Sequence, residues 1–172
     1  MDIEPDTKDW TWVLVRPCPE CGLAAGDVDP TEIAARVLAD LPRWEHVLRR
    51  TEARERPVPE TWSATEYACH VRDVFELFER RIRLMLDEDD PIFPNWNQDE
   101  AAIADDYAAQ LPSEVASQLV AAGRAVAETF ERIPADGWDR VGRRSNGSTF
   151  TVATLGQYFL HDVVHHLHDV RG

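Results

Sequence analysis

Four amphipathic segments, each long enough for several helical turns, dominate this sequence. Within them apolar residues recur at intervals of three and four, which is the spacing of one buried stripe on an α-helix. The segments run from about residue 29 to 50, from about 63 to 86, from about 113 to 133 and from about 150 to 169. Stretches rich in proline and glycine separate them, so we expect an all-α four-helix bundle.

Capping residues support the predicted helix starts. Ser63 and Glu66 have the three-residue offset of a capping box at the start of the second main helix. Ser113 is the candidate N-cap of the third main helix, and Thr149 or Thr151 is the candidate N-cap of the last.

Two longer segments lie outside the four main helices. Residues 87–97 are acidic and contain proline, and their length predicts a crossover between the second and third main helices, followed by a short helix over about 98–105. Residues 1–28 hold the aromatic and β-branched run Trp10–Val15 and then a loop, which predicts an N-terminal extended arm. The bundle domain would then span residues 29–172.

The charge of the chain limits its partners. Only 18 Lys and Arg oppose 32 Asp and Glu, and the formal net charge of -14 would repel a nucleic acid backbone. No stretch approaches the ~20 consecutive apolar residues of a membrane span, and the first residues lack a signal-peptide pattern. We therefore expect a cytoplasmic protein with a small-molecule substrate, no nucleic acid partner and no membrane partner.

The histidines carry the strongest functional signal. His161 and His165 are four residues apart, so both side chains lie on one helical face, which the apolar neighbours mark as inward. His70 lies on a core-facing stripe of the second helix, whereas His166 points about 100° away from His165. Neutral imidazoles are common zinc ligands, so His70, His161 and His165 predict a divalent metal site inside the bundle. Taken singly, a histidine on an apolar face is more often a hydrogen-bonded structural residue than a ligand.

A second candidate site involves two of the three cysteines. Cys18 and Cys21 have the spacing of a zinc half-site, but no second Cys-x-x-Cys pair exists to complete it. The pair could form a second zinc site by borrowing His166, His168 or His46. A redox pair, or a turn with inactive thiols, is the alternative interpretation.

The run WSATEYACHVRD at residues 62–73, together with His161-x-x-x-His165, resembles the DinB/YfiT-like superfamily over about residues 30–170. The resemblance implies a four-helix bundle with an overhand crossover. It also implies a divalent ion, commonly nickel or zinc, held by one histidine of the second helix and two of the fourth. By match to that motif, the ligands would be His70, His161 and His165.

The resemblance also bears on the reaction. Relatives with assigned activities are thiol-dependent S-transferases or isomerases, such as mycothiol-dependent maleylpyruvate isomerase, and their cosubstrates are low-molecular-weight thiols such as mycothiol or bacillithiol. Three imidazoles would leave coordination positions open for water or a thiolate, so hydrolysis and thiol transfer would use the same ligands. A non-catalytic metal- or thiol-sensing module and a structural homodimer are the alternative hypotheses.

Carboxylates near the histidines are candidates for supporting roles. Glu66 and Asp73 lie about one helical turn to either side of His70 and are candidate catalytic groups, which could orient an imidazole or accept a proton. A capping glutamate and a surface aspartate are the alternative interpretations. Asp162 and Asp169 are weaker candidates for the same orienting role.

Overall fold

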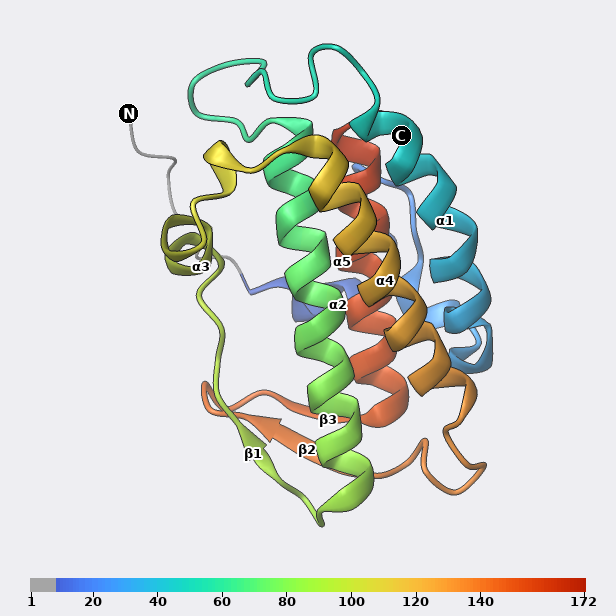
Figure 1. The fold of residues 1–172 in the computed structure, drawn as a ribbon. Helices are drawn as coiled ribbons and strands as arrows, with labels where there is room; N and C mark the ends of the chain where they lie inside the picture. The colour runs from blue at the N-terminus through green and yellow to red at the C-terminus, as the bar shows by residue number, and fades with distance from the viewer. Residues whose placement is uncertain (1–8) are drawn as a thin grey trace.

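Four long helices form the bundle in the computed structural model, which describes residues 9–172 (Figure 1). They are α1 (Ile33–Leu48), α2 (Ala64–Asp87), α4 (Pro112–Glu131) and α5 (Val152–Asp169). In the view of Figure 1, α1 and α5 ascend while α2 and α4 descend. Both α1 and α2 pack against α4 and α5, so α1 and α2 lie on one diagonal of the bundle. The predicted all-α four-helix bundle is confirmed.

The connection between α2 and α4 runs along the length of the bundle. It contains the short strand β1 (Ile92–Phe93), the helix α3 (Gln98–Ala104) and the 3-10 turn η4 (Tyr107–Ala109). Because α2 and α4 point in the same direction, the chain must return from one end of the bundle to the other between them (Figure 1). The predicted crossover and its short helix are therefore confirmed.

A small sheet closes the lower end of the bundle in Figure 1. Strands β2 (Val141–Arg144) and β3 (Thr149–Thr151) form an antiparallel hairpin, and β1 pairs with β2 in parallel. The sheet thereby joins the beginning of the crossover to the chain that leads directly into α5.

Two of the predicted caps are confirmed and one is wrong. Ser63 and Thr151 each accept a hydrogen bond from the backbone three residues later, and both sit in reciprocal capping boxes. The N-cap of α4 is Leu111 instead of Ser113, with Pro112 as the first helical residue. Proline has no N–H to lose and a φ already suited to a helix, so α4 begins there.

The arm before α1 is coiled instead of extended over the residues that the structure describes. It forms three 3-10 turns, η1 (Trp10–Leu14), η2 (Ala25–Asp27) and η3 (Pro30–Glu32), all of which contact α5. Asp9 caps η1 by accepting a hydrogen bond from the Thr11 N–H, and the turn buries Val13 completely. Residues 1–8 of the predicted arm lie outside the described part of the chain.

An aromatic cluster fixes α5 against its neighbours. Phe159 of α5 is fully buried, and its ring contacts Phe75 and Phe78 of α2 and Phe130 of α4 at centroid distances of 5.9, 5.3 and 5.5 Å. Burying large rings is the main source of core stability. The cluster sets the rotation of α5, and hence the directions in which its histidines point.

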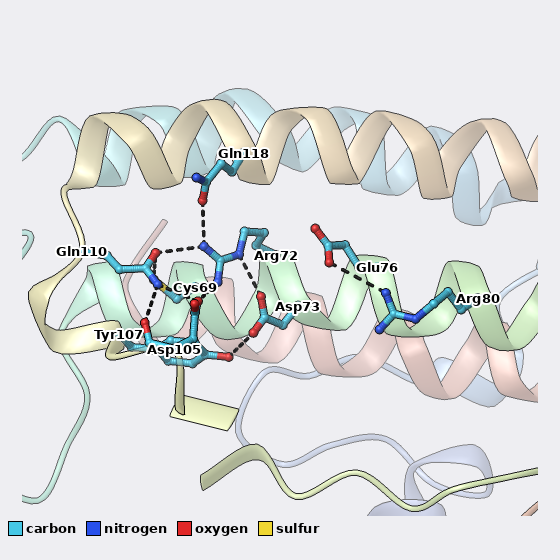
Figure 2. Close-up of polar contacts among 9 residues, drawn as sticks. All are labelled: Cys69, Arg72, Asp73, Glu76, Arg80, Asp105, Tyr107, Gln110 and Gln118. Carbon is cyan, nitrogen blue, oxygen red and sulfur yellow. Dashed lines mark hydrogen bonds and ion pairs between the residues drawn. The ribbon is translucent and has the colours of Figure 1, made fainter. Parts of the chain in front are cut away.

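A buried arginine fastens the crossover to α2 (Figure 2). The Arg72 guanidinium donates hydrogen bonds to Asp73 at 2.8 Å, Asp105 at 2.6 Å, Gln110 at 2.9 Å and Gln118 at 2.7 Å. Asp105 and Gln110 belong to the crossover, whereas Gln118 belongs to α4. One side chain therefore joins α2, α4 and the crossover segment that passes the histidines.

Candidate metal centres

Three groups of metal-ligand side chains meet on α5, and within each group the donor atoms lie within 4.8 Å of one another. One of them, formed by Glu20, His165 and Asp169, shares His165 with a larger group, and the other two share no ligand. The first, which we call the cleft site, consists of His70, Asp162 and His166. The second, which we call the arm site, consists of Cys18, Cys21, His161 and His165. Successive helical residues point about 100° apart, so the pairs 161/165 and 162/166 face different neighbours, the arm and α2.

The structure does not gather His70, His161 and His165 into one ligand group. The ring of His70 meets that of His166, with centroids 4.7 Å apart, while His161 meets His165 at 5.1 Å. The sequence predicted that His166 points away from the metal site and that Asp162 only orients a ligand. The sequence does contain a signal for grouping Asp162 and His166 with His70, because Asp162 and His166 are also four residues apart and share one helical face.

The donor atoms of the cleft site converge on one carboxylate oxygen. Nε2 of His166 lies 3.1 Å and Nε2 of His70 lies 3.6 Å from Oδ1 of Asp162. Nδ1 of His166 is 2.9 Å from Asp169, which fixes the orientation of that ring. His70 is 1% exposed, and neither of its ring nitrogens has a hydrogen-bond partner among the described residues. The cleft site thus contains the buried imidazole of His70, whose nitrogens lack a hydrogen-bond partner there.

The charges at the cleft site suit a cation. Burial raises the pKa of the Asp162 carboxyl, but His166 and His70 outweigh burial and hold that pKa far below its usual range. Burial lowers the pKa of His166, while Asp162 and Asp169 raise it to about 9, so without metal this ring carries a proton. Burial lowers the pKa of His70, which is therefore a neutral ring at neutral pH. Metal ligands must be deprotonated, so an ion would displace the His166 proton.

A cleft of about 800 Å³ opens onto this site. Asp162 and His166 line it, and His70 is covered by Trp96, whose ring stacks on it at 5.4 Å. Among the described residues that line the cleft, Arg144 is the one lysine or arginine. The cleft therefore combines a cation site between α2 and α5 with a single arginine side chain on the hairpin.

The two candidate catalytic carboxylates belong to neither ligand group. Glu66 closes the capping box of α2 and accepts hydrogen bonds from the Arg56 guanidinium and, at 2.8 Å, from the Ser63 N–H. Asp73 accepts hydrogen bonds from Arg72 and from the Tyr107 hydroxyl. Both carboxylates are thus engaged in contacts that hold the fold, and a direct catalytic role gains no support from their positions.

Glu66 should contribute stability that disappears in acid. Burial raises its pKa, but Arg56 and Ser63 outweigh burial and the pKa is lowered overall. The contribution is therefore present above the unfolded pKa of ~4.3 and is lost as pH falls through the lower folded pKa. A glutamine side chain would still fit the capping box, and the Arg56 partner is partly exposed. The substitution Glu66→Gln should therefore cost about 1–2 kcal/mol at pH 7, the loss of one screened charged hydrogen bond.

Urea unfolding of the wild type and Glu66→Gln from pH 7 to pH 3 checks this expectation. The difference in unfolding free energy should shrink steadily below a pH of about 4.3. Glu76→Gln is the matched control, because its exposed partner Arg80 is 3.8 Å away and the pair should contribute little at any pH. An unfolding difference that stays constant down to pH 3 would show that the Glu66 charge is not involved.

The arm site joins the cysteine pair to the face of α5 that carries His161 and His165. Sγ of Cys18 lies 3.6 Å from Nδ1 of His165. Burial and the neighbouring His165 lower the pKa of His161 to about 4, so this ring is neutral and able to bind a metal. The sequence suggested His166, His168 or His46 as partners of the cysteines, and none of these belongs to the group. His46 and His168 are exposed, and His166 belongs to the cleft site.

Comparisons with known proteins agree with the fold. A family model described as DinB superfamily matches residues 34–170. The structure is similar to that of YfiT from Bacillus subtilis, described as a probable metal-dependent hydrolase with an unusual four-helix bundle topology. The TM-score is 0.67 at 15% sequence identity, over 97% of this chain and 89% of that one. No curated protein matches the sequence.

Proposed function

The chain belongs to the DinB superfamily, and from this membership and the cleft geometry we propose that it is a metal-dependent enzyme acting on a small molecule. The observation that carries the proposal is the convergence of two imidazole nitrogens and one carboxylate oxygen beside a cleft. Two histidines and one carboxylate leave coordination positions open, which is typical of catalytic metal sites and unlike closed structural ones. The description of YfiT as a probable metal-dependent hydrolase supports the same interpretation.

The residues of the cleft site fit a divalent ion such as Zn²⁺ or Ni²⁺. Both metals accept imidazole ligands, and both form bonds of about 2.0–2.2 Å to nitrogen or oxygen donors. Oδ1 of Asp162 lies 3.1 Å from Nε2 of His166 and 3.6 Å from Nε2 of His70, which is close to the separation of two donor atoms bonded to one such ion. An unsatisfied buried ring nitrogen costs about 1–3 kcal/mol of stability. An ion bound at the cleft site would give the His70 nitrogen a partner and remove this cost.

The surrounding side chains would orient the ligands and the substrate. A divalent ion supplies Lewis acidity, which lowers the pKa of a water molecule or thiol in its open positions. Asp169 accepts the Nδ1 proton of His166 and so directs Nε2 toward the site. The Trp96 ring shields His70 from solvent. Arg144, held by Asn146 and Ser148, offers a positive charge for an anionic group of the substrate.

Hydrolysis and thiol S-transfer are the two reactions that the proposal covers. Metal-loaded protein should be incubated with a panel of simple esters and amides, and separately with electrophiles in the presence of mycothiol or bacillithiol. We expect turnover in one panel, lost with a chelator and in Asp162→Ala. A large metal-dependent rise in melting temperature with no product in either panel would contradict the enzyme and favour the non-catalytic sensing module.

The cellular setting is part of the proposal. Cys18, Cys21 and Cys69 are free thiols, which suits the reducing cytoplasm. None of the helices within residues 9–172 is long and apolar enough to cross a membrane. A homodimer and the lack of nucleic acid binding stay predictions, which sedimentation of the purified protein with and without DNA would check.

A further inference from the structure

We propose that the arm site, formed by Cys18, Cys21, His161 and His165, binds a structural zinc ion that fastens the N-terminal arm to α5. This ion would be distinct from the ion of the cleft site, because the two groups share no ligand. Two thiolates and two imidazoles fill a tetrahedral shell, and a closed shell of this composition is typical of structural zinc.

The cysteine loop already has the turn that a zinc half-site needs. The Cys18 N–H donates to the Leu23 carbonyl and the Gly22 N–H donates to the Cys18 carbonyl, both at 2.9 Å. Gly22 has a φ of 77°, a conformation that side chains rarely adopt, directly after the second cysteine. The loop thus folds back on itself and directs two cysteines, three residues apart, toward α5.

The donor spacing matches a tetrahedral ion. Zinc bonds of about 2.3 Å to sulfur and 2.0–2.1 Å to nitrogen place sulfur and nitrogen about 3.6 Å apart at tetrahedral angles. Sγ of Cys18 and Nδ1 of His165 are 3.6 Å apart, and all four donors lie within 4.8 Å of one another. Small side-chain rotations would bring the whole set to bonding distance.

Both imidazoles of the arm site are arranged as ligands. His161 is 4% exposed, and its Nε2 has no hydrogen-bond partner among the described residues. Nε2 of His165 lies 3.4 Å from Glu20 and 3.7 Å from Asp169, so these carboxylates can hold its proton and leave Nδ1 for the ion. A carboxylate behind a metal-bound histidine is a common supporting contact. Glu20 itself lies between the two cysteines.

Zinc binding here would shape the cleft as well as the arm. The Trp10 ring stacks on His161 at a centroid distance of 5.8 Å, and Trp10 also lines the cleft. The four ligands come from two segments far apart in the sequence, so the ion would close a long loop of the chain. Binding converts two thiols to thiolates and releases two protons to solvent, with no change of oxidation state.

Cobalt substitution tests the proposal directly. Untagged protein, stripped of metal and kept reduced without oxygen, is titrated with Co²⁺ alone. We expect the absorption of a thiolate-to-cobalt charge transfer to stop rising by about two added equivalents, because the cleft site also takes up the ion while the arm site is the one described ligand group with sulfur. The absorption should be lost in Cys18→Ser and Cys21→Ser and retained in Cys69→Ser, the matched control thiol.

The same titration separates this site from the proposed enzyme site. His70→Phe should keep the cobalt–thiolate absorption even if it binds no other ion and shows no activity. Wild type without that absorption, or Cys18→Ser and Cys21→Ser variants that retain it, would overturn the proposal. A Cys18–Cys21 disulfide in protein purified under reducing, oxygen-free conditions would overturn it as well, in favour of a redox pair.

Limited proteolysis supplies a second readout that does not depend on spectra. With free Zn²⁺ at about 100 times the Kd, the open fraction of the arm falls about 100-fold, and cleavage within residues 9–28 should slow accordingly. Cleavage at a rate indifferent to zinc and to chelator would mean that no ion holds the arm.

Discussion

Replacing His70 with phenylalanine should empty the cleft site of metal, whereas replacing His161 with phenylalanine should leave that ion in place and remove the ion of the arm site. The first change deletes one of three cleft ligands but keeps a ring between Trp62 and Trp96. Loss of an outer-shell partner already costs about 10–100-fold in metal affinity, so loss of a direct ligand should cost more. Bound ions per chain and competition with a chelator measure both effects.

Asp169→Asn is the matched control for this pair. It alters a carboxylate that bonds Nδ1 of His166 and also lies 3.7 Å from Nε2 of His165, so the loss of metal affinity at either site should stay within about 10–100-fold. If His161→Phe and His70→Phe both empty the same single site, the grouping of His70, His161 and His165 inferred from the sequence is correct and the two-site arrangement is not. Measuring sulfur-ligated cobalt alongside total metal distinguishes these outcomes in one experiment.

The sequence predicted the four helices because each buries a stripe whose spacing is visible without coordinates. It also predicted which two helices carry the candidate ligands, since His70, His161 and His165 lie on inward faces of their helices. Periodicity alone could not choose between the pairs 161/165 and 162/166, which differ by one residue and about 100°. That choice depends on the rotation of α5, which the aromatic cluster around Phe159 and the packing of the arm set together.

The arm illustrates a second limit of sequence reasoning. The run Trp10–Val15 has the composition of a strand, but β-propensity is realised only where a neighbouring strand can pair. The arm instead packs on a helix. Its backbone N–H and C=O groups form their hydrogen bonds within 3-10 turns, and the arm contacts α5. The partners of Cys18 and Cys21 were hidden for the same reason, because they depend on where the arm docks.

Replacing Arg72 with methionine should produce the largest loss of stability among the polar substitutions considered. The Arg72 side chain is 9% exposed and bonds two carboxylates, and removing one partner of a buried charge network typically costs about 3–5 kcal/mol. Asp105 is half exposed and can regain water, so the lower end, about 3 kcal/mol, is expected. For a chain of this length that corresponds to a fall in melting temperature of about 6–12 °C.

Arg80, further along the same helix, is the matched control, and both arginines appear in Figure 2. Arg80 is exposed and its oxygen partner on Glu76 is 3.8 Å away, so Arg80→Met should change stability by no more than about 0.5 kcal/mol. Arg72→Met should also weaken metal binding at the cleft site, because the crossover that Arg72 holds carries Trp96, which covers His70. Equal melting temperatures for the two variants would mean that the crossover is held by its apolar contacts and by the sheet, with the arginine network contributing nothing.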